Sequence, residues 1–274
     1  FEGGAASKQA EAMADAITHR GPDDSGVWVD PEAGIALAHR RLSILDLSSA
    51  GHQPMISASG RYVIVFNGEI YNHNEIRTEL KFEGYQWRGT SDTESFLAGI
   101  ETWGLESTLK KSVGMFAFAL WDRENKEILL ARDRMGEKPL YYGVNSGIFF
   151  FGSELKALKA HPNFEGVVDR DSVALYLRHN YIPSPYSIYR GINKLIPGTY
   201  LCIPKKELAH AHEIEPTPYW SLQRASTRGQ DNPFLGNEDE ALDELERLLS
   251  QSVQAQCIAD VPLGAFLSGG IDSS

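Results

Sequence analysis

Residues 62–72 read Tyr-Val-Ile-Val-Phe-Asn-Gly-Glu-Ile-Tyr-Asn. The first five, Tyr62 to Phe66, form an apolar run that predicts one strand. Asn67 and Gly68 follow directly, and this dipeptide is also common in turns. After a strand, the pair offers a side-chain amide and an uncovered backbone N–H, which are the donors that a developing oxyanion requires. The stretch therefore predicts a strand with polar, chemically useful groups at its end.

Short strand-like runs on both sides of this stretch dominate the first 160 residues. Turns containing Gly-Pro or Asp-Pro punctuate them, and two helices are predicted, from Asn72 to about Phe82 and from Ser91 to about Trp103. The predicted strands cover residues 27–29, 35–38, 62–66, 115–121, 127–132, 141–143 and 148–151. Runs of strands with segregated helices favour an α+β protein over a doubly wound sheet.

The last third of the chain changes character. A helical segment is predicted from Asp169 to about His179, and residues 204–236 are polar and contain proline, as in an interdomain linker. Asn237 then begins an amphipathic helix with leucines at helical spacing. We therefore divide the chain into a first domain (1–203), a linker (204–236) and the start of a second domain (237–274).

The chain ends on Ser268-Gly269-Gly270-Ile271-Asp272-Ser273-Ser274, which follows an apolar run, 261–267, with the length of one buried strand. Paired glycines let backbone N–H groups approach a phosphate, and a helix beginning at the two serines would add its dipole. No Gly-Lys-Ser/Thr follows, so this is not a Walker loop. The stretch predicts a nucleotide-phosphate site, with a Gly-rich turn as the alternative.

Composition limits the function further. The chain has 274 residues, 42% of them hydrophobic, and a net charge of −11. It has no basic run with which to neutralise nucleic-acid phosphates and no apolar stretch approaching the roughly 20 residues that span a bilayer. Its two cysteines, Cys202 and Cys257, have no disulfide or metal spacing, so we expect core-packing thiols in a cytoplasmic protein.

Three charged side chains complement the Asn67-Gly68 pair. Arg41 offers a planar fork suited to a carboxylate, and Glu69 and Asp92 could bind an ammonium group. With the oxyanion donors they describe a pocket for a free amino acid undergoing amide hydrolysis. Each has a structural alternative: Arg41 as a surface ion pair, and Asp92 as the carboxylate of a Ser-x-x-Glu capping box.

Seven stretches of the chain, taken in order, resemble the glutamine-hydrolysing asparagine synthetases. They are HRGPD (19–23), RLSILD (41–46), FNGEIYN (66–72), TSDTE (90–94), ARDRMGEKPLYY (131–142), FGSELKAL (151–158) and SGGIDSS (268–274). The resemblance covers nearly the whole chain. It implies an α+β domain of class II glutamine amidotransferase type, an αββα sandwich of the N-terminal nucleophile (Ntn) hydrolase fold. The first helix, strand and pyrophosphate loop of an α/β ATP-pyrophosphatase domain would follow it.

The resemblance also assigns residues to two sites. The implied glutamine site comprises Arg41, Leu42, Ile44, Leu45, Asn67, Gly68, Glu69 and Asp92, with Asn67 and Gly68 as the oxyanion hole. The implied ATP site comprises Phe266, Ser268, Gly269, Gly270, Ile271, Asp272, Ser273 and Ser274. No residue of this chain is expected to ligate a metal.

The family reaction, carried over by resemblance, has two halves. An N-terminal Cys thiolate, with its own α-amine as base, attacks the side-chain amide of glutamine and releases glutamate and ammonia. Ammonia crosses a tunnel to a site where ATP and Mg²⁺ activate aspartate as β-aspartyl-AMP, giving asparagine, AMP and pyrophosphate. The implied partners are glutamine, aspartate and ATP, with no nucleic acid or membrane; family members are often homodimers.

One departure from the family pattern bears on activity. The nucleophile should be the first residue of the mature protein, but the chain starts at Phe1, which aligns several residues after that cysteine. We interpret the chain as a fragment truncated at both ends, and expect the printed polypeptide to be inactive. Rival interpretations are a related amide ligase or amidotransferase of envelope or secondary-metabolite biosynthesis, and a Cys-less glutamine-binding module.

Overall fold

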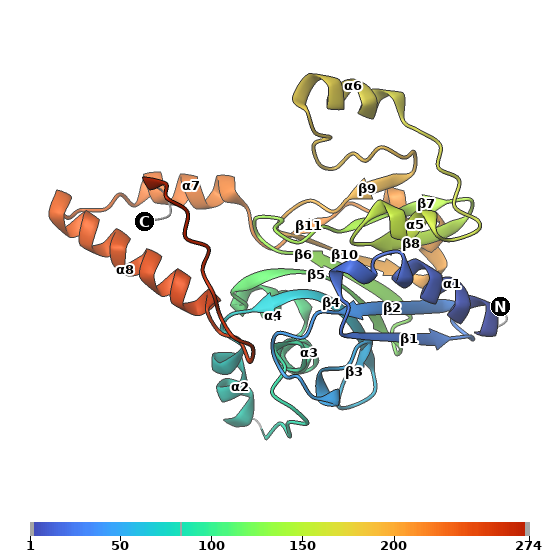
Figure 1. The fold of residues 1–274 in the computed structure, drawn as a ribbon, viewed down its shortest axis with the longest axis horizontal. Coiled ribbons are helices and arrows are strands. Elements are labelled where there is room, and N and C mark those ends of the chain that lie inside the picture. The colour runs from blue at the N-terminus through green and yellow to red at the C-terminus, as the bar shows by residue number, and fades with distance from the viewer. Residues whose placement is uncertain (1–2, 83, 272–274) are drawn as a thin grey trace.

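The computed structural model describes residues 3–82 and 84–271, and in it two layers of β-sheet lie face to face with helices outside each layer (Figure 1). One layer is a six-stranded sheet in the order β11-β10-β6-β5-β4-β3; the other holds the pair β1-β2 and the three-stranded sheet β8-β7-β9. The strands are β1 (Asp24–Asp30), β2 (Ile35–Arg41), β3 (Met55–Ile56), β4 (Tyr62–Ile70), β5 (Gly114–Asp122), β6 (Glu127–Arg132), β7 (Tyr141–Asn145), β8 (Ile148–Gly152), β9 (Ile192–Lys194), β10 (Thr199–Pro204) and β11 (Thr217–Pro218).

Helices form the two outer layers and the C-terminal extension. The α-helices are α1 (Gly3–Asp15), α2 (His73–Phe82), α3 (Asp92–Trp103), α4 (Leu105–Lys111), α5 (Leu155–Lys159), α6 (Arg170–His179), α7 (Leu222–Asp231) and α8 (Glu238–Gln256). Short 3₁₀ segments are η1 (Thr18–Arg20), η2 (Ser49–Gly51) and η3 (Lys205–Glu213). None of the helices in the described residues is long and apolar enough to cross a membrane.

Strand β4 is apolar along its whole first half because both of its faces are buried. Successive side chains of a strand point to opposite faces. Ile64 and Phe66 accordingly pack under α2 and α3, whereas Val63 and Val65 face the second sheet layer. The strand pairs with β5 in antiparallel register, with Phe66 opposite Phe118.

An aromatic cluster fixes the helices on the outer face of the six-stranded sheet. The ring of Phe96, from α3, lies 5.5 Å from Phe66 and 5.2 Å from Phe118, centroid to centroid. Phe116 completes the cluster, and all four rings are almost fully buried. Burying one such side chain stabilises the fold by about 1.5–3 kcal/mol, so this cluster anchors α3 and its N-terminus to β4.

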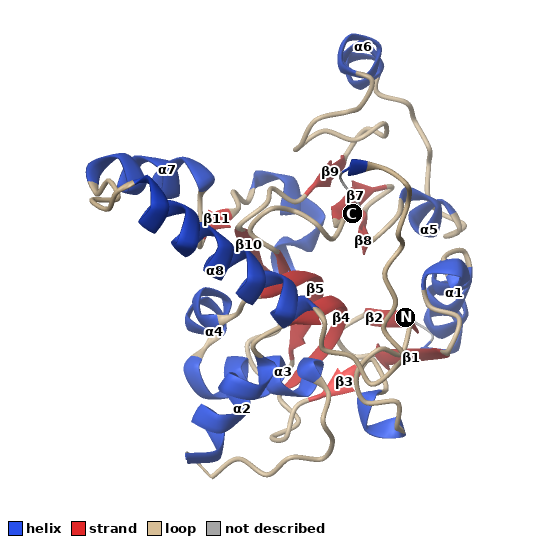
Figure 2. Cartoon of the chain, turned by 60° about the vertical axis from the view of Figure 1, so that its left-hand side comes forward, coloured by secondary structure: helices blue, strands red, loops and turns tan. Residues whose placement is uncertain are grey.

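The opposite face of the six-stranded sheet packs on β2 and β7, and a third, smaller core joins β8 to α5 and to partly buried side chains of the α1 segment. The order of layers is therefore α2–α4, six-stranded sheet, second sheet layer, and α1 with α5 (Figure 2). This arrangement confirms the predicted α+β class and αββα sandwich.

The prediction of only two helices in the first 160 residues was wrong. The structure adds α1, α4 and α5. Helix α1 could have been recognised, because Ala6, Ala10 and Ala14 recur every fourth residue and are all buried. Small side chains at this spacing let the helix lie close to β1 and β2.

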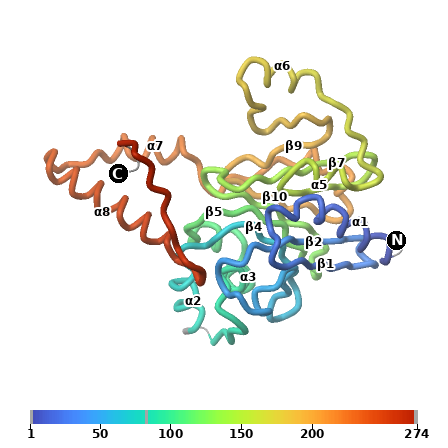
Figure 3. Tube along the Cα trace, viewed as in Figure 1, coloured from blue at the N-terminus to red at the C-terminus, as the bar shows by residue number. Residues whose placement is uncertain are grey.

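The C-terminal part departs from the expected pattern. Helices α7 and α8 extend away from the sandwich (Figure 3), and the apolar positions of α8, such as Leu245 and Leu249, are exposed. The strand predicted over 261–267 is not formed in the structure. A strand needs a neighbour for its backbone hydrogen bonds, and none of the described strands pairs with this segment.

The segment predicted as a linker is partly ordered onto the first domain. Within it η3 contributes buried Ala211, and β11 pairs with β10. Just after β11, Tyr219 is buried in the core under the six-stranded sheet. The sandwich therefore includes residues up to about 220, and the division at 203 and 236 stays a prediction.

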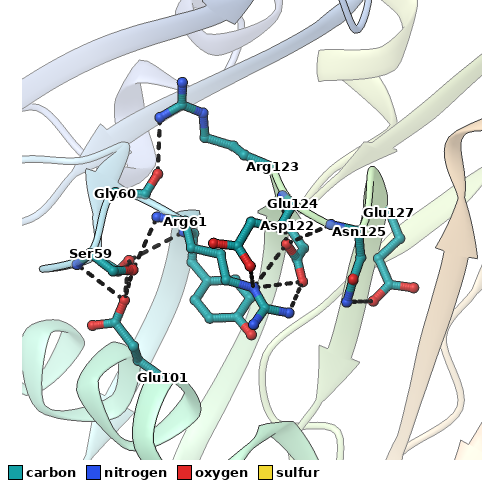
Figure 4. A network of polar contacts seen from close by, with 11 residues as sticks. Ser59, Gly60, Arg61, Glu101, Asp122, Arg123, Glu124, Asn125 and Glu127 are labelled. Carbon is teal, nitrogen blue, oxygen red and sulfur yellow. Dashed lines mark hydrogen bonds and ion pairs between the residues drawn. The ribbon is translucent and has the colours of Figure 1, made fainter.

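A polar network closes the turn between β5 and β6 (Figure 4). Arg61 Nη2 donates to Asp122 Oδ2 at 2.6 Å, and Arg61 Nε donates to both carboxylate oxygens at 3.1 Å. Asp122 is only 1% exposed and also accepts the backbone amides of Glu124 and Asn125. Beside it, Arg123 Nη1 donates to the Gly60 carbonyl at 2.9 Å.

Candidate functional site

Arg41 is the last residue of strand β2, and its guanidinium group binds backbone carbonyl groups of the loop that follows. The guanidinium Nη2 donates to the carbonyl oxygens of Leu45 at 2.9 Å and Asp46 at 2.5 Å, and Nη1 donates to that of Ser48 at 3.3 Å. Arg41 is buried, and a Cβ at Gly51 would lie 2.0 Å from Nη2, so a larger residue at position 51 would displace the guanidinium. The alternative interpretation of Arg41 as part of a surface ion pair is therefore wrong.

The loop after Arg41 carries the three predicted apolar site residues. Leu42 is exposed, whereas Ile44 and Leu45 are half-buried. Asp23 accepts the backbone N–H of Ser43 at 2.8 Å, which ties the start of the loop to the segment before β1. The structure therefore places these residues beside Arg41, on one loop whose curvature Arg41 itself maintains.

Asn67, Gly68 and Glu69 lie inside β4, which continues to Ile70 instead of ending at Phe66. The turn interpretation of Asn67-Gly68 is wrong, because Asn67 pairs with Ala117 and Gly68 with Phe116. The amide Nδ2 of Asn67 and one carboxyl oxygen (Oε1) of Glu69 are buried without a hydrogen-bond partner. Buried polar atoms are rarely left unpaired, so these two point to a bound polar group.

Gly68 is required where it stands because β4 and β5 approach closely. A Cβ at this position would lie 2.1 Å from the carbonyl oxygen of Met115 and 2.6 Å from the Cα of Phe116. These distances are well below van der Waals contact, so no other residue fits without moving one strand. The glycine thereby keeps the backbone of Asn67 and Glu69 in register with β5.

Asp92 begins α3 and reaches back to β4. Its Oδ2 accepts the N–H of Ile70 at 2.9 Å, and its Oδ1 accepts the N–H of Thr93 at 2.8 Å. Ser91 caps the helix, but the predicted capping box is wrong. Glu94 accepts the backbone N–H groups of Arg88 and Gly89, so it does not return to Ser91.

Two carboxyl groups share this site, and the pKa of each is raised. Burial raises the pKa of Asp92 to about 6, although its two backbone hydrogen bonds and the charge of Arg41 act in the opposite direction. Burial, together with the charge of Asp92, raises the pKa of Glu69 to about 7. A cationic group bound between the two carboxyl groups would lower both of these pKa values. The site thus combines one guanidinium, two carboxyl groups and an unpaired amide donor, which suits a zwitterion.

A groove of about 270 Å³ runs beside this site, between β2 and β8. Neither of these strands pairs with the other: β2 pairs with β1, and β8 with β7. Helices α1 and α5 cover the groove and β4 and β5 form its floor, with Asn67 at the floor. Representative lining residues are Ala6, Ala10, Ala36, Ala38, Val65, Asn67, Ala117, Phe149, Phe151 and Ala157.

His39 also lines the groove and was given no role by the sequence. Burial and the neighbouring charge of Arg41 lower its pKa to about 4. Its imidazole is therefore neutral near pH 7. Asp46, whose carbonyl accepts from Arg41, is a second residue without a predicted role. His39 lies near the end of β2 and Asp46 in the loop after it, and the polar stretch 39–46 was the available signal.

The residues predicted to bind ATP lie apart from the hydrophobic cores. Phe266, Ser268, Gly269, Gly270 and Ile271 are exposed, and Asp272, Ser273 and Ser274 lie outside the described residues. A Cβ added to Gly269 would meet nothing within 4 Å, so its backbone is open to a ligand. The structure brings the glutamine-site residues together, whereas the described residues of the predicted ATP site, 266 and 268–271, are all exposed.

Comparison with known proteins agrees with this geometry. Residues 2–220 match the family of glutamine amidotransferase domains, and residues 244–274 match the asparagine synthase family. A putative asparagine synthetase [glutamine-hydrolyzing] of Mycobacterium tuberculosis is 38% identical over 100% of this chain and 42% of its own length. Asparagine synthetase [glutamine-hydrolyzing] 3 of Bacillus subtilis is 35% identical over 96% of this chain and 41% of its own length.

Amidase chry2 of Gibberella zeae is 34% identical over 97% of this chain and 38% of its own length. The chain thus spans well under half the length of these relatives. Among solved structures, glutamine phosphoribosylpyrophosphate (PRPP) amidotransferase from B. subtilis superposes with a TM-score of 0.57 at 16% identity, over 78% of this chain and 47% of that one. This likeness shows the fold, the Ntn-type sandwich of glutamine amidotransferases. By the family match over residues 2–220, the chain belongs to the glutamine amidotransferase domain family.

Proposed function

We propose that the full-length protein is a glutamine-hydrolysing asparagine synthetase. It hydrolyses glutamine to glutamate and ammonia, and it transfers the ammonia to ATP-activated aspartate to give asparagine, AMP and pyrophosphate. The observation that carries the first half is the pair of unpartnered buried atoms, Asn67 Nδ2 and Glu69 Oε1, beside Asp92 and Arg41.

In this proposal each polar group meets one part of glutamine. The carboxyl groups of Glu69 and Asp92 bind its α-ammonium group, and the remaining N–H groups of Arg41 bind its α-carboxylate. Asn67 Nδ2 and the Gly68 backbone N–H stabilise the oxyanion that forms on the side-chain carbonyl. Leu42, Ile44 and Leu45 contact the substrate from the loop that Arg41 supports.

The nucleophile in this proposal is an N-terminal cysteine on a strand that occupies the groove between β2 and β8. Both strands present a free edge there, and the alanines of the floor and cover leave room for a backbone. Neither Cys202, on β10, nor Cys257, exposed after α8, lines this groove. The strand would end near Asn67, which places a thiolate within reach of the oxyanion donors.

The second half of the reaction is proposed for the region that follows α8. The open backbone around Gly269 and the hydroxyl of Ser268 suit a polyphosphate, and Mg²⁺ would neutralise phosphate charge there. Aspartate as acceptor rests on the relatives' names and on the match of residues 244–274. A homodimeric, cytoplasmic enzyme belongs to the same proposal.

A second candidate has one observation in its favour. The similarity to Amidase chry2 covers nearly the whole chain at almost the same identity as the asparagine synthetases. An amide-forming enzyme with another carboxylate acceptor is therefore the alternative. Glutamine hydrolysis would be common to both candidate functions.

One isotope experiment distinguishes these functions. The full-length protein is given glutamine labelled with ¹⁵N in the side-chain amide, together with ATP, Mg²⁺ and aspartate. Labelled asparagine supports the proposal, and glutamate release without asparagine favours the second candidate. Arg41→Ala should abolish glutamine-dependent synthesis but retain synthesis from free ammonium ions, since the acceptor half does not use Arg41. Equal loss of both would contradict the assigned glutamine site.

A further inference from the structure

A second pocket, of about 210 Å³, lies beside the segment that connects α6 to β9 (Figure 1). Its lining includes Arg132 at the end of β6, Tyr141 on β7, Lys194 on β9, and Tyr181 and Ser184 from that segment. Tyr141 and Lys194 are opposite each other in the β7–β9 pair, so their side chains lie on the same face. The volume is below the roughly 300–1,000 Å³ of sites that bury drug-sized ligands, so this pocket suits a small molecule.

Two cationic side chains line this pocket, and the hydrogen bonds that the structure gives them go to backbone carbonyl groups. The Arg132 guanidinium donates to three carbonyl oxygens, at 2.7 to 2.9 Å. Lys194 Nζ donates to the carbonyl oxygen of Ile182. Terminal guanidinium nitrogens and an ammonium group carry more hydrogens than these bonds use. Both cations therefore keep N–H groups with which to bind an anion.

The carboxylates nearest to this pair of cations are bound elsewhere, and the lining of the pocket contains no Asp or Glu. Asp133, next in sequence to Arg132, accepts backbone N–H groups of the chain around it. Glu154, whose charge acts on Tyr141, is paired with other cationic side chains. Burying a charge without a counter-ion is unfavourable, so an anion bound in the pocket would be stabilised by both cations.

The pKa values of the two cations reflect the same imbalance of charge. Burial lowers the pKa of Lys194, and the neighbouring charge of Arg132 lowers it further. Burial also lowers the pKa of Arg132, whereas Asp133 and Tyr141 act in the opposite direction. An anion bound between Lys194 and Arg132 would raise both pKa values.

The arrangement of donors favours a phosphate group over a carboxylate. A carboxylate pairs best with the planar fork of a guanidinium, but carbonyl oxygens already occupy the fork of Arg132. The other donors belong to separate side chains, namely the ammonium of Lys194 and the hydroxyl groups of Tyr141, Tyr181 and Ser184. A phosphate group has enough oxygens to accept from several such donors at once.

We propose that this pocket binds the phosphate group of a small molecule, with Lys194 and Arg132 as its cationic ligands. The pocket is distinct from the glutamine site, because Asn67, Ala117 and Arg132 form one row across β4, β5 and β6 and Arg132 is at its far end. Leu140 lines both this pocket and the groove between β2 and β8, and so lies between them. The inference does not depend on the proposed function, and it adds a second binding site to the amidotransferase domain.

The first test measures phosphate binding to the full-length protein and to the variant Lys194→Gln, by titration calorimetry at constant ionic strength. The side-chain amide of the variant can still donate to the Ile182 carbonyl, so the fold is kept and only the charge is lost. We expect the variant to bind inorganic phosphate on the order of tenfold more weakly than the wild type. Lys194→Arg should retain most of the affinity.

Lys205→Gln is the matched control. Lys205 also donates to a backbone carbonyl, that of Glu32 at 3.0 Å, but it is exposed and lines neither pocket. Its substitution should leave phosphate binding unchanged.

Chemical modification locates the bound phosphate. Acetylation of individual lysines in the wild type is followed by mass spectrometry, with and without inorganic phosphate. At a phosphate concentration about ten times the Kd, acetylation of Lys194 should slow on the order of tenfold, in proportion to occupancy, and that of Lys205 should not change. Equal protection of the two lysines, or equal phosphate affinity in the wild type and Lys194→Gln, would overturn the inference.

The same two measurements with AMP and with succinate define the ligand. A Lys194-dependent affinity that is higher for AMP than for inorganic phosphate assigns the pocket to a nucleotide, and the reverse assigns it to free phosphate; both results support a phosphate site. Protection of Lys194 by succinate alone would show that the pocket selects carboxylates, and the phosphate assignment would fail. None of these readouts uses glutamine hydrolysis, so their failure leaves the proposed function untouched.

Discussion

The carboxylate of Asp92 accepts the backbone N–H of Ile70 at 2.9 Å, and this bond joins the N-terminus of α3 to the last residue of β4. The same carboxylate caps its own helix through Thr93. Asp92 is thus a structural clamp between two elements, and in the proposed function it is also a ligand for glutamine. These two roles respond differently to substitution.

We expect Asp92→Ala to lower the free energy of unfolding by about 2 kcal/mol, because the Ile70 N–H is left buried without an acceptor. Asp92→Asn keeps one acceptor and should lose less stability. Both should raise KM for glutamine on the order of tenfold or more, since neither carries the charge. Thermal unfolding of the full-length variants measures the change in stability, and glutaminase kinetics measure the change in KM. A normal KM in Asp92→Asn would remove Asp92 from the glutamine site.

Glu69 should make stability depend on pH in an unusual direction. Burial and the charge of Asp92 raise its pKa to about 7 from an ordinary value of 4.5. The folded state therefore holds the proton more tightly than the unfolded chain, and Glu69 destabilises the fold progressively as pH rises from about 4.5 to about 7. Glu69→Gln should be neutral near pH 4 and should stabilise the protein on the order of 2 kcal/mol at pH 8.

Unfolding midpoints of Glu69→Gln and wild type across this pH range test the assignment. Glu11→Gln, on the exposed side of α1, is the control for loss of a surface carboxylate. A stabilisation by Glu69→Gln that is equal at pH 4 and pH 8 would mean that the Glu69 carboxyl has an ordinary pKa.

Gly68→Ala should disturb both the fold and the site. Its Cβ would lie 2.1 Å from the Met115 carbonyl, so β4 must separate from β5, at a cost of about 3 kcal/mol. Gly229 in α7 is the matched control, because a Cβ there meets nothing within 4 Å. Gly229→Ala should be neutral or slightly stabilising. Comparable unfolding temperatures for the two variants would contradict the close approach of β4 and β5.

The Arg61–Asp122 ion pair should contribute most to the stability of the fold at neutral pH. Burial alone would raise the pKa of Asp122, but its hydrogen bonds with Arg61, Asn125 and Glu124 hold that pKa below the ordinary value of 3.8. The stabilisation is therefore complete above about pH 4 and is lost as pH falls through the lowered pKa. We expect Arg61→Ala to cost about 2 kcal/mol at pH 7 and much less near pH 2.

Arg123→Ala provides the comparison within the same turn (Figure 4). Arg123 donates to a backbone carbonyl at an exposed position, so its loss should cost less than about 1 kcal/mol at either pH. Equal effects of Arg61→Ala and Arg123→Ala at pH 7 would show that Asp122 does not depend on its partner.

Local patterns predicted most of the strands of the sandwich. The apolar run Tyr62–Phe66 correctly predicted a strand. The run is continuous because residues on both faces of β4 are buried. The sequence did not show that β4 continues to Ile70, since Asn67 and Gly68 are turn formers whose pairing with Ala117 and Phe116 depends on β5. Helix α1 was missed although its alanine spacing was visible.

The candidate site was predicted as a set of residue types and not as an arrangement. Arg41 was expected to face a ligand, and its bonds to the carbonyls of Leu45 and Asp46 were not foreseen. The apolar run 261–267 predicted a strand that the structure does not form. The pattern alone does not supply the neighbouring strands that such a segment requires.

The sequence by itself determined the class of fold, the strands of the core and the identity of the polar groups that follow them. Periodicity and strand-forming runs are local properties, so they can be read without coordinates. Only the tertiary structure decided that Glu69 is buried next to Asp92, and this burial, together with the charge of Asp92, raises the pKa of Glu69. It alone decided that Asp46 and Asp260 meet across 214 residues, because such contacts depend on how the whole chain packs.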